Sequence, residues 1–180
     1  KRKESDRELK IPWWLKIGGS GIAAFAVGSI LLATPYHQDQ TFPLDSRQAE
    51  SFEISLLLHG DQHVLRLAKP DEEPRIRVQG NGFGVPGSAI KYIWKNEPAE
   101  EHYFQLKQRR SGWFSELNQS TEVILPRDQP GFVKLVIESG TAEVNLAELA
   151  KRQKWKVEVD DKKAFKLQGE RPEQLELIIM

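Results

Sequence analysis

Short runs of alternating apolar and polar residues fill the chain from Ser51 to its end. Eleven of these runs are bounded by turn residues, lie near ten residues apart and are predicted to be β-strands: 51–58, 63–68, 75–79, 90–94, 102–108, 121–125, 132–138, 142–146, 155–159, 164–168 and 174–180. Only 145–153 has a helix-like pattern, and it is short enough to be a turn. The pattern predicts one all-β domain over 51–180, a sandwich or a short solenoid.

A long apolar run precedes this domain. Ile17 to Thr34 contains no charged residue over 18 positions, and a helix of that length would be about 27 Å long, close to the thickness of a bilayer core. We therefore expect a mainly β protein in which a single N-terminal transmembrane helix, 13–35, precedes the all-β domain. A cleaved signal peptide and a buried core helix are the alternatives.

The residues around and within the run suit a membrane helix. Four residues are expected at the membrane interfaces: Trp13, Trp14, Lys16 and Tyr36. Small residues at helical spacing predict a face that packs against another helix: Ser20, Gly21, Ala24 and Gly28. Because small residues are common in membrane helices, a simple anchor without a partner helix is an equal alternative.

Charge and polarity divide the remaining N-terminal residues. Residues 1–12 form a basic tail, and 36–50 are polar, contain Pro43 and are expected to be a linker. Six basic residues precede Gly18, so the positive-inside rule puts the N-terminus in the cytoplasm. We expect a protein of the inner membrane whose C-terminal domain is periplasmic or extracellular.

Composition excludes several classes of function. Beyond the first 16 residues the chain has 20 basic and 23 acidic residues, a net charge of −3, without the concentrated basic face that nucleic acid needs. The chain has no Cys, which excludes disulfides, cysteine nucleophiles and thiolate-bound iron–sulfur clusters. The sequence predicts no nucleic-acid partner.

A faint repeat appears near the C-terminus. "KLVIESGTAEVNL" (134–146) and "WKVEVDDKKAFKL" (155–167) both have the pattern strand, polar turn, strand, about 21 residues apart. We favour two ordinary hairpins; two coils of a solenoid are the alternative.

"VIESGTAEVNLAEL", within residues 132–149, resembles the repeating unit of toast-rack-type domains. These domains are β-solenoids of adhesin and envelope-stress proteins in bacteria. The usual Gly-Ala-Gly turn of the family is replaced here by Ser139, Gly140 and Thr141. The resemblance implies a stacked β fold in the cell envelope, and it implies no catalytic residues.

Two short motifs are compatible with chemistry but lack its context. "GFGVPG" (82–87) matches G-x-G-x-x-G, yet the residues that follow favour a strand where a dinucleotide site needs a helix. "HGDQH" (59–63) spaces two His and an Asp as metal ligands, but Gly60-Asp61 predicts a hairpin turn that would separate them. No G-x-S-x-G nucleophile motif is present. We expect no cofactor, no nucleotide, no metal and no enzyme activity.

"RRSGWFSEL" (109–117) is the candidate contact surface. Arg and Trp are typical anchors of protein interfaces, and the same combination suits lipid headgroups. We predict a partner or lipid contact by Arg109, Arg110, Trp113 and Phe114. The alternative is an aromatic pair that packs in the core at one end of the β domain.

Three functions remain. The first is a non-catalytic accessory subunit whose helix docks into a larger membrane complex and whose outer β domain braces that complex, with lipid and membrane-protein subunits as partners. The second is a free-standing bacterial envelope protein of toast-rack type, used in adhesion or stress sensing. The third is an envelope enzyme or lipid-binding protein with a hydrophobic β groove.

Overall fold

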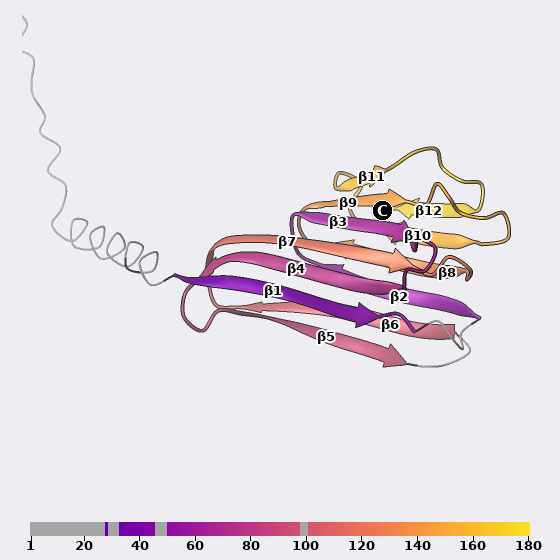
Figure 1. The fold of residues 1–180 in the computed structure, drawn as a ribbon. Helices are drawn as coiled ribbons and strands as arrows, with labels where there is room; N and C mark the ends of the chain where they lie inside the picture. The colour runs from indigo at the N-terminus through magenta and orange to yellow at the C-terminus, as the bar shows by residue number, and fades with distance from the viewer. Residues whose placement is uncertain (1–27, 29–32, 46–49, 98–100) are drawn as a thin grey trace, which may run out of the picture.

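The computed structural model describes residue 28 and residues 33–45, 50–97 and 101–180. In these ranges the chain forms twelve β-strands (Figure 1). In chain order they are β1 (Thr34–Pro43), β2 (Ser51–Leu58), β3 (Gln62–Leu67), β4 (Arg75–Gly84), β5 (Ala89–Glu97), β6 (Glu101–Ser111), β7 (Phe114–Leu125), β8 (Gly131–Ile137), β9 (Thr141–Asn145), β10 (Trp155–Val159), β11 (Phe165–Leu167) and β12 (Leu175–Ile179). All eleven predicted strands are present, and the all-β part of the expected fold is confirmed.

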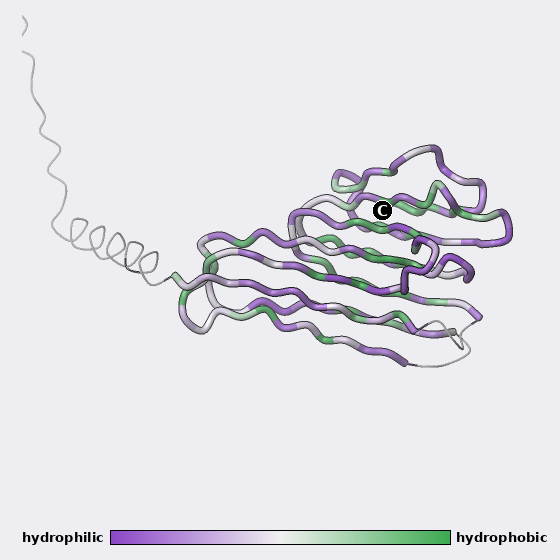
Figure 2. Tube along the Cα trace, viewed as in Figure 1, coloured by the Kyte–Doolittle hydropathy of each residue, from purple (hydrophilic) through white to green (hydrophobic). Residues whose placement is uncertain are grey.

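The strands form two six-stranded sheets that lie face to face (Figure 1). The order is β1-β4-β7-β3-β9-β11 in the first, sheet A, and β12-β10-β8-β2-β6-β5 in the second, sheet B. Alternation along each strand directs apolar side chains into the space between the sheets. Several of them have no exposed surface: Ile54, Leu56, Phe104, Val133, Val144 and Val157. Figure 2 shows apolar and polar stretches alternating along the strands.

Four strand pairs each cross from sheet B to sheet A: β2–β3, β6–β7, β8–β9 and β10–β11. Their strands run parallel to their neighbours, as β2 does with β6 and β8, and β3 with β7 and β9. Each pair is therefore one coil of a short β-solenoid. The coils stack in the spatial order β6–β7, β2–β3, β8–β9, β10–β11, so the second pair along the chain is the first in space.

The faint C-terminal repeat corresponds to two of these coils. β8 pairs with β10 in sheet B, with Val133 beside Val157, and β9 pairs with β11 in sheet A, with Val144 beside Leu167. The preferred interpretation as two hairpins is wrong, because the two strands of each unit lie in different sheets and do not pair with each other. The helix-like stretch 145–153 forms no helix: Asn145 ends β9, and turns follow at 147–148 and 151–152.

The turns between the sheets stack through backbone hydrogen bonds. Asp61 N donates to Gln119 O at 2.8 Å, and Thr141 N donates to Asp61 O at 3.1 Å. The turn after β8 has Gly140 at a φ of 88°, where a Cβ atom would lie 2.1 Å from the carbonyl oxygen of Gly60. Glycine is therefore required at this point of the stack.

Four long antiparallel strands extend one end of the solenoid. β4 and β7 pair in sheet A, and β5 and β6 pair in sheet B. These strands have 9 to 12 residues, against 5 to 8 in β2, β3, β8 and β9. Their connections, residues 83–88 and 111–114, project beyond the coil stack (Figure 1), and we call these residues the tip.

The N-terminal part of the prediction needs correction. No helix among the described residues is long and apolar enough to cross a membrane. Most of the expected transmembrane helix, 13–35, lies outside the described residues, but Thr34 and Pro35 belong to β1. The expected linker, 36–50, is also strand as far as Pro43, which pairs with Arg75 of β4. The β domain therefore begins earlier than Ser51, and the described fold is two β-sheets without a membrane helix.

Candidate functional site

The two connections of the tip are joined to each other by hydrogen bonds. The carbonyl oxygen of Trp113 accepts a hydrogen bond from Val85 N at 3.0 Å and another from Ser88 Oγ at 2.7 Å. Ser88 Oγ also accepts a hydrogen bond from Trp113 N at 3.0 Å. The connection from β4 to β5 and the connection from β6 to β7 thus form one double turn at the end of the molecule (Figure 1).

Gly112 allows these two connections to approach so closely. It has a φ of 81°, and a Cβ atom there would lie 2.6 Å from the Cα atom of Ser88. Any side chain at 112 would push the connections apart. The sequence therefore specifies the double turn through a glycine on one connection and a serine on the other.

Two large apolar side chains of the tip face solvent. Phe83 is 45% exposed and Trp113 is 49% exposed. Only Ile179 and Met180, at the far edge of sheet B, share this property among the described residues. Exposed aromatic side chains on one double turn are a candidate contact surface.

Phe114 differs from its neighbour Trp113. It is half-buried, and its ring meets the ring of Tyr36 edge-on at a centroid distance of 5.3 Å. The guanidinium group of Arg110 lies over the Phe114 ring, with its carbon atom 5.9 Å from the ring centroid. The predicted aromatic pair is therefore divided: Trp113 is available for contact, and Phe114 supports the base of the tip.

A polar bridge between the sheets lies directly behind the tip. Gln119 of β7 accepts a hydrogen bond from Gln108 of β6 at 2.9 Å and one from Arg110 at 3.3 Å, both at its Oε1. Its Nε2 donates to the hydroxyl of Tyr92 of β5 at 3.2 Å. Burial raises the pKa of Tyr92 to about 12, so this hydroxyl keeps its proton. The bridge fixes the two sheets relative to each other where the apolar core ends.

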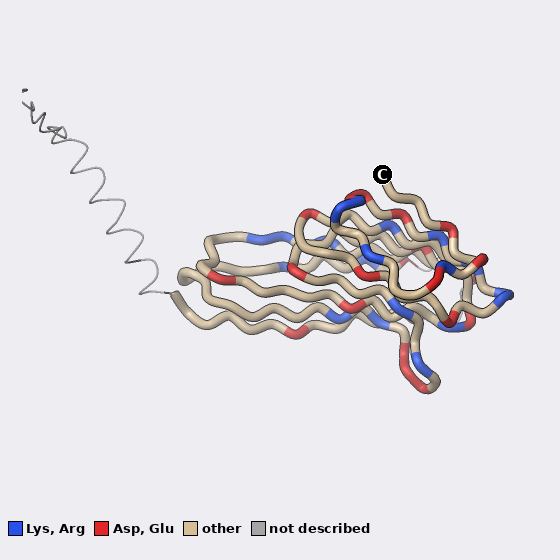
Figure 3. The backbone as a smooth tube through the Cα atoms, turned by 90° about the horizontal axis from the view of Figure 1, so that it is seen from above, with Lys and Arg blue, Asp and Glu red and all other residues tan. Residues whose placement is uncertain are grey.

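The ends of the strands next to the tip, residues 81–91 and 109–118, have an excess of positive charge. Lys91 and Arg109 are cross-strand neighbours on β5 and β6, both are exposed, and neither forms an ion pair with a described residue. Arg110 adds a third cation, and Glu116 is the single acidic residue within 81–91 and 109–118. Elsewhere acidic and basic residues are interleaved along the strands (Figure 3).

Both motifs that the sequence singled out lie at connections between strands. "GFGVPG" joins β4 to β5, is followed by a strand where a dinucleotide motif needs a helix, and supplies Phe83 to the tip. In "HGDQH", His59 Nδ1 lies 3.0 Å from a Glu138 carboxylate oxygen, while the Asp61 carboxylate accepts from Gln119 N. His63 is buried, which lowers its pKa. No group of three potential metal ligands occurs in the part of the chain that the structure describes.

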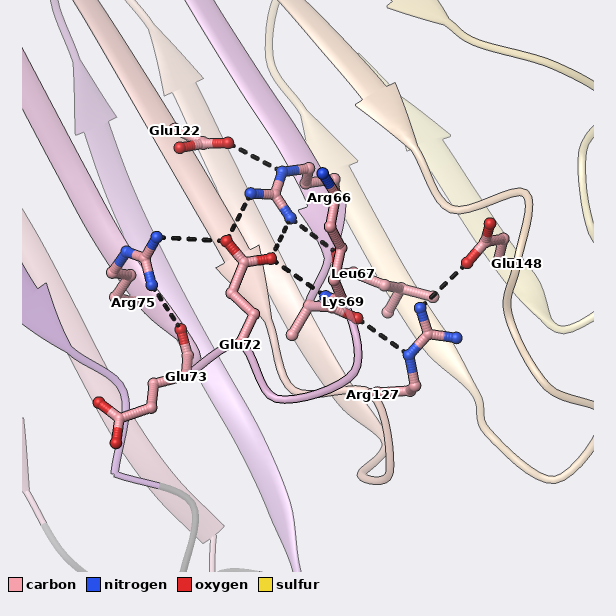
Figure 4. Close-up of polar contacts among 10 residues, drawn as sticks. Arg66, Leu67, Lys69, Glu72, Glu73, Arg75, Glu122, Arg127 and Glu148 are labelled. Atoms are coloured by element: carbon pink, nitrogen blue, oxygen red, sulfur yellow. Dashed lines mark hydrogen bonds and ion pairs between the residues drawn. The ribbon is translucent and has the colours of Figure 1, made fainter.

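An open hollow away from the tip contains two arginines that are already paired with acidic side chains. This hollow of about 320 Å³ is lined by Arg66, Lys69 and Arg127. Figure 4 shows that Arg66 bonds to Glu72 and Glu122, and that Arg127 bonds to Glu148. Arg127 Nε also donates to the Ala68 carbonyl oxygen at 2.9 Å. These arginines therefore hold the surrounding loops rather than offer a site for an anion.

The other predicted site residues stay predictions. The expected interface residues Trp13, Trp14 and Lys16 lie outside the described residues, and Tyr36 is a half-buried residue of β1. Of the expected helix-packing face, Ser20, Gly21 and Ala24 also lie outside them, and Gly28 has a helical conformation. Of the predicted contact residues, Trp113 lies in the tip, and Arg109 and Arg110 lie in β6 directly behind it. The sequence analysis missed Phe83, which stands between the glycines of a motif that suggested only a loop.

An elongated β-solenoid that exposes aromatic side chains at one end is the class of structure that these observations define. No family model matches the chain, and no curated protein matches it. Among solved structures, a "putative cell adhesion protein" from Clostridium sporogenes is 14% identical, with 69% of this chain and 58% of that chain covered and a TM-score of 0.39. A "putative adhesin" from Parabacteroides merdae is 12% identical, with 79% and 52% covered and a TM-score of 0.26.

The alignment covers only slightly more than half the length of either solved protein. The expected weak resemblance to adhesin-type β domains is confirmed at this level. Similarity this low says nothing about what the present chain binds.

Proposed function

We propose that this chain is a non-catalytic binding domain of the bacterial envelope that acts outside the cytoplasm and holds its tip against a partner. The observation that carries the proposal is the pair of exposed aromatic side chains, Phe83 and Trp113, on a double turn closed by hydrogen bonds. Leaving two such side chains in water is unfavourable, and contact with a partner would relieve that cost.

The rigidity of the tip supports a binding role. The connections are fixed by Ser88 and Gly112, and the strands behind them are fixed by the Gln119 bridge. A surface that is already ordered loses little conformational entropy when it binds. The resemblance of residues 132–149 to toast-rack domains supports the envelope location, because those residues contain a solenoid coil, β8–β9.

The other two hypotheses receive less support. The described residues and the comparisons contain nothing that favours a subunit of a larger membrane complex. A hydrophobic β groove would have to open between the sheets, where side chains such as Leu58, Leu65 and Leu135 fill the space. The cavity that these three residues line has no room for a water molecule.

Photo-crosslinking tests the proposal. Because the chain has no Cys, a cysteine in place of the exposed tip residue Pro86 can carry a photoreactive group without removing either aromatic side chain. We expect the full chain to form adducts in cell envelopes from position 86. We expect few from Asp128→Cys, which lies in the loop after the opposite end of β7.

A pair of double variants supplies the control. Phe83→Ser with Trp113→Ser should lower the adduct yield from position 86 about fivefold or more, the factor that ~1 kcal/mol of binding energy implies. Ile179→Ser with Met180→Ser removes the other two exposed apolar side chains and should leave the yield unchanged. All these side chains are exposed, so thermal unfolding should shift little. Equal yields from positions 86 and 128 would refute the proposed function.

A further inference from the structure

We infer that the surface which the tip contacts is an anionic lipid bilayer. The inference rests on the proposed function and names the partner of the same site. Two properties of the tip lead to it: the kind of apolar side chain that it exposes, and the unpaired cations directly behind those side chains.

The exposed apolar groups suit the boundary between headgroups and acyl chains. Val85 and Pro86 add to the apolar surface of Trp113 and Phe83, because both are apolar and at least partly exposed to solvent. Trp is enriched at membrane interfaces because its ring is apolar and its indole N–H is polar. A protein pocket would have to match the shape of these groups, whereas a bilayer accepts them without a fixed shape.

The cations lie at the depth where headgroup phosphates would be. Ala89 pairs with Ser111 at the end of sheet B, and Lys91 pairs with Arg109 two residues further back. That separation is about 7 Å along the strands, a distance that Lys and Arg side chains can span. Since neither side chain has an ion pair with a described residue, both are free to meet an anionic surface.

The N-terminal strand reaches the bilayer end of the molecule as well. Thr34 pairs with Gly84, and its Oγ1 lies 3.2 Å from the Gly84 carbonyl oxygen. In the sequence the uncharged run from Ile17 ends at Thr34. The most apolar part of the sequence therefore joins the β domain at the tip and not at its far end.

Spin labelling of the full chain tests the inference. A nitroxide at Pro86→Cys reports the depth of the tip, and one at Asp128→Cys reports the far end. Vesicles of phosphatidylcholine are compared with vesicles that also contain phosphatidylglycerol. In the anionic vesicles we expect the label at 86 to gain collisions with oxygen and lose collisions with a water-soluble nickel chelate several-fold. The label at 128 should stay in water.

The charge and aromatic contributions are then separated. Lys91→Gln with Arg109→Gln should return the label at 86 toward water in anionic vesicles, and Phe83→Ser with Trp113→Ser should do the same. Equal burial of the label in both kinds of vesicle would overturn the role of the cations. A label at 86 as exposed as the label at 128 in every vesicle would overturn the lipid inference.

The two proposals fail in different ways. If position 86 forms adducts in cell envelopes but its label stays in water on protein-free vesicles, the partner is a macromolecule other than lipid. The proposed function would then hold and the lipid inference would fall. If position 86 forms no adducts in envelopes and stays exposed on vesicles, both fall.

Discussion

Gly140 occupies a place where two turns of the solenoid touch. Its φ of 88° belongs to the region that other residues avoid, and a Cβ atom would lie 2.1 Å from Gly60 O. The strain of this φ raises the energy of any other residue by roughly 1 to 3 kcal/mol. The close approach of a Cβ atom would force the backbone of one turn to move, because the obstructing atom is itself a backbone atom.

We predict that Gly140→Ala lowers the free energy of unfolding by about 3 kcal/mol or more. Gly87→Ala is the matched control, since Gly87 has the same φ of 88° but nothing lies within 4 Å of an added Cβ atom. The control should lose only about 1 kcal/mol, from the backbone conformation. Urea denaturation of both variants measures the difference, and equal losses would show that the turns do not need close contact.

Single residues of the tip could be predicted only in part. Arg109, Arg110 and Trp113 were identified from the residue types alone. Phe114 could not be separated from Trp113, because its burial depends on the edge contact with Tyr36, 78 residues earlier in the chain. Phe83 lacked any local signal, because it occupies an outward-facing position of β4, in line with the polar residues Gln79 and Asn81.

The loop from β3 to β4 is held by one carboxylate. Glu72 bonds to the guanidinium of Arg66 at 2.6 Å and 2.8 Å, to Arg75 at 3.2 Å and to Lys69 N at 3.0 Å (Figure 4). Hydrogen bonds from Arg66, above all, lower the pKa of Glu72 to about 2. The loop and the two strands that it joins are thus tied together by a charge that persists in mild acid.

This network predicts an acid-sensitive stability. The folded pKa of Glu72 is depressed, so its contribution is complete above the ordinary value of 4.5 and is lost as pH falls toward about 2. We predict that Glu72→Gln reduces the loss of unfolding free energy between pH 5 and pH 2.5, by on the order of 1 kcal/mol for a network at the surface.

A control variant isolates that effect. Glu170→Gln changes an exposed glutamate and should leave the pH profile as it is. The pKa of Asp39 is also lowered to about 2, by its hydrogen bonds to Arg77, so part of the acid loss should remain in Glu72→Gln. Unfolding in urea at a series of pH values measures the profiles. Identical profiles for Glu72→Gln and the unsubstituted chain would contradict the assignment.

Strands were predictable where they face the apolar core. β2 and β10 have the predicted bounds because every second residue is buried. β1 gave no such signal: it has a Pro near each end, and its inward positions include Gln38 and Gln40. The first half of β7 was missed for the same reason, since Gln119 there faces the polar bridge in place of the apolar core.

The arrangement of the whole molecule depends on contacts that no local pattern reports. Two coils near the C-terminus were visible as a faint repeat because β8–β9 and β10–β11 follow each other both in the chain and in space. The coil β6–β7 stacks on the outside of β2–β3, against the order of the chain. That inversion brings β6 and β7 beside β5 and β4, and so it creates the tip from two distant segments.

The N-terminal error has a different cause. The apolar run and its aromatic flanks predicted a membrane helix through Pro35, yet Thr34 to Pro43 pairs with all ten residues of β4. Pairing in the sheet satisfies the backbone hydrogen-bonding groups of this polar strand. A hydropathy pattern does not include that stabilisation. The described molecule thus has two different ends. One end is a close-packed stack of coils, and at the other end long strands present Phe83 and Trp113.

The central claim is that the tip is the surface by which this protein makes contact. Hydroxyl-radical footprinting of the unsubstituted full chain tests it most directly, with oxidation of each side chain measured by mass spectrometry. Trp113, Phe83 and Met180 are 49%, 45% and 63% exposed, so all three should be oxidised in the purified protein. In cell envelopes we predict that Trp113 and Phe83 become protected while Met180 stays reactive. Unchanged oxidation of Trp113 and Phe83 in envelopes would contradict it.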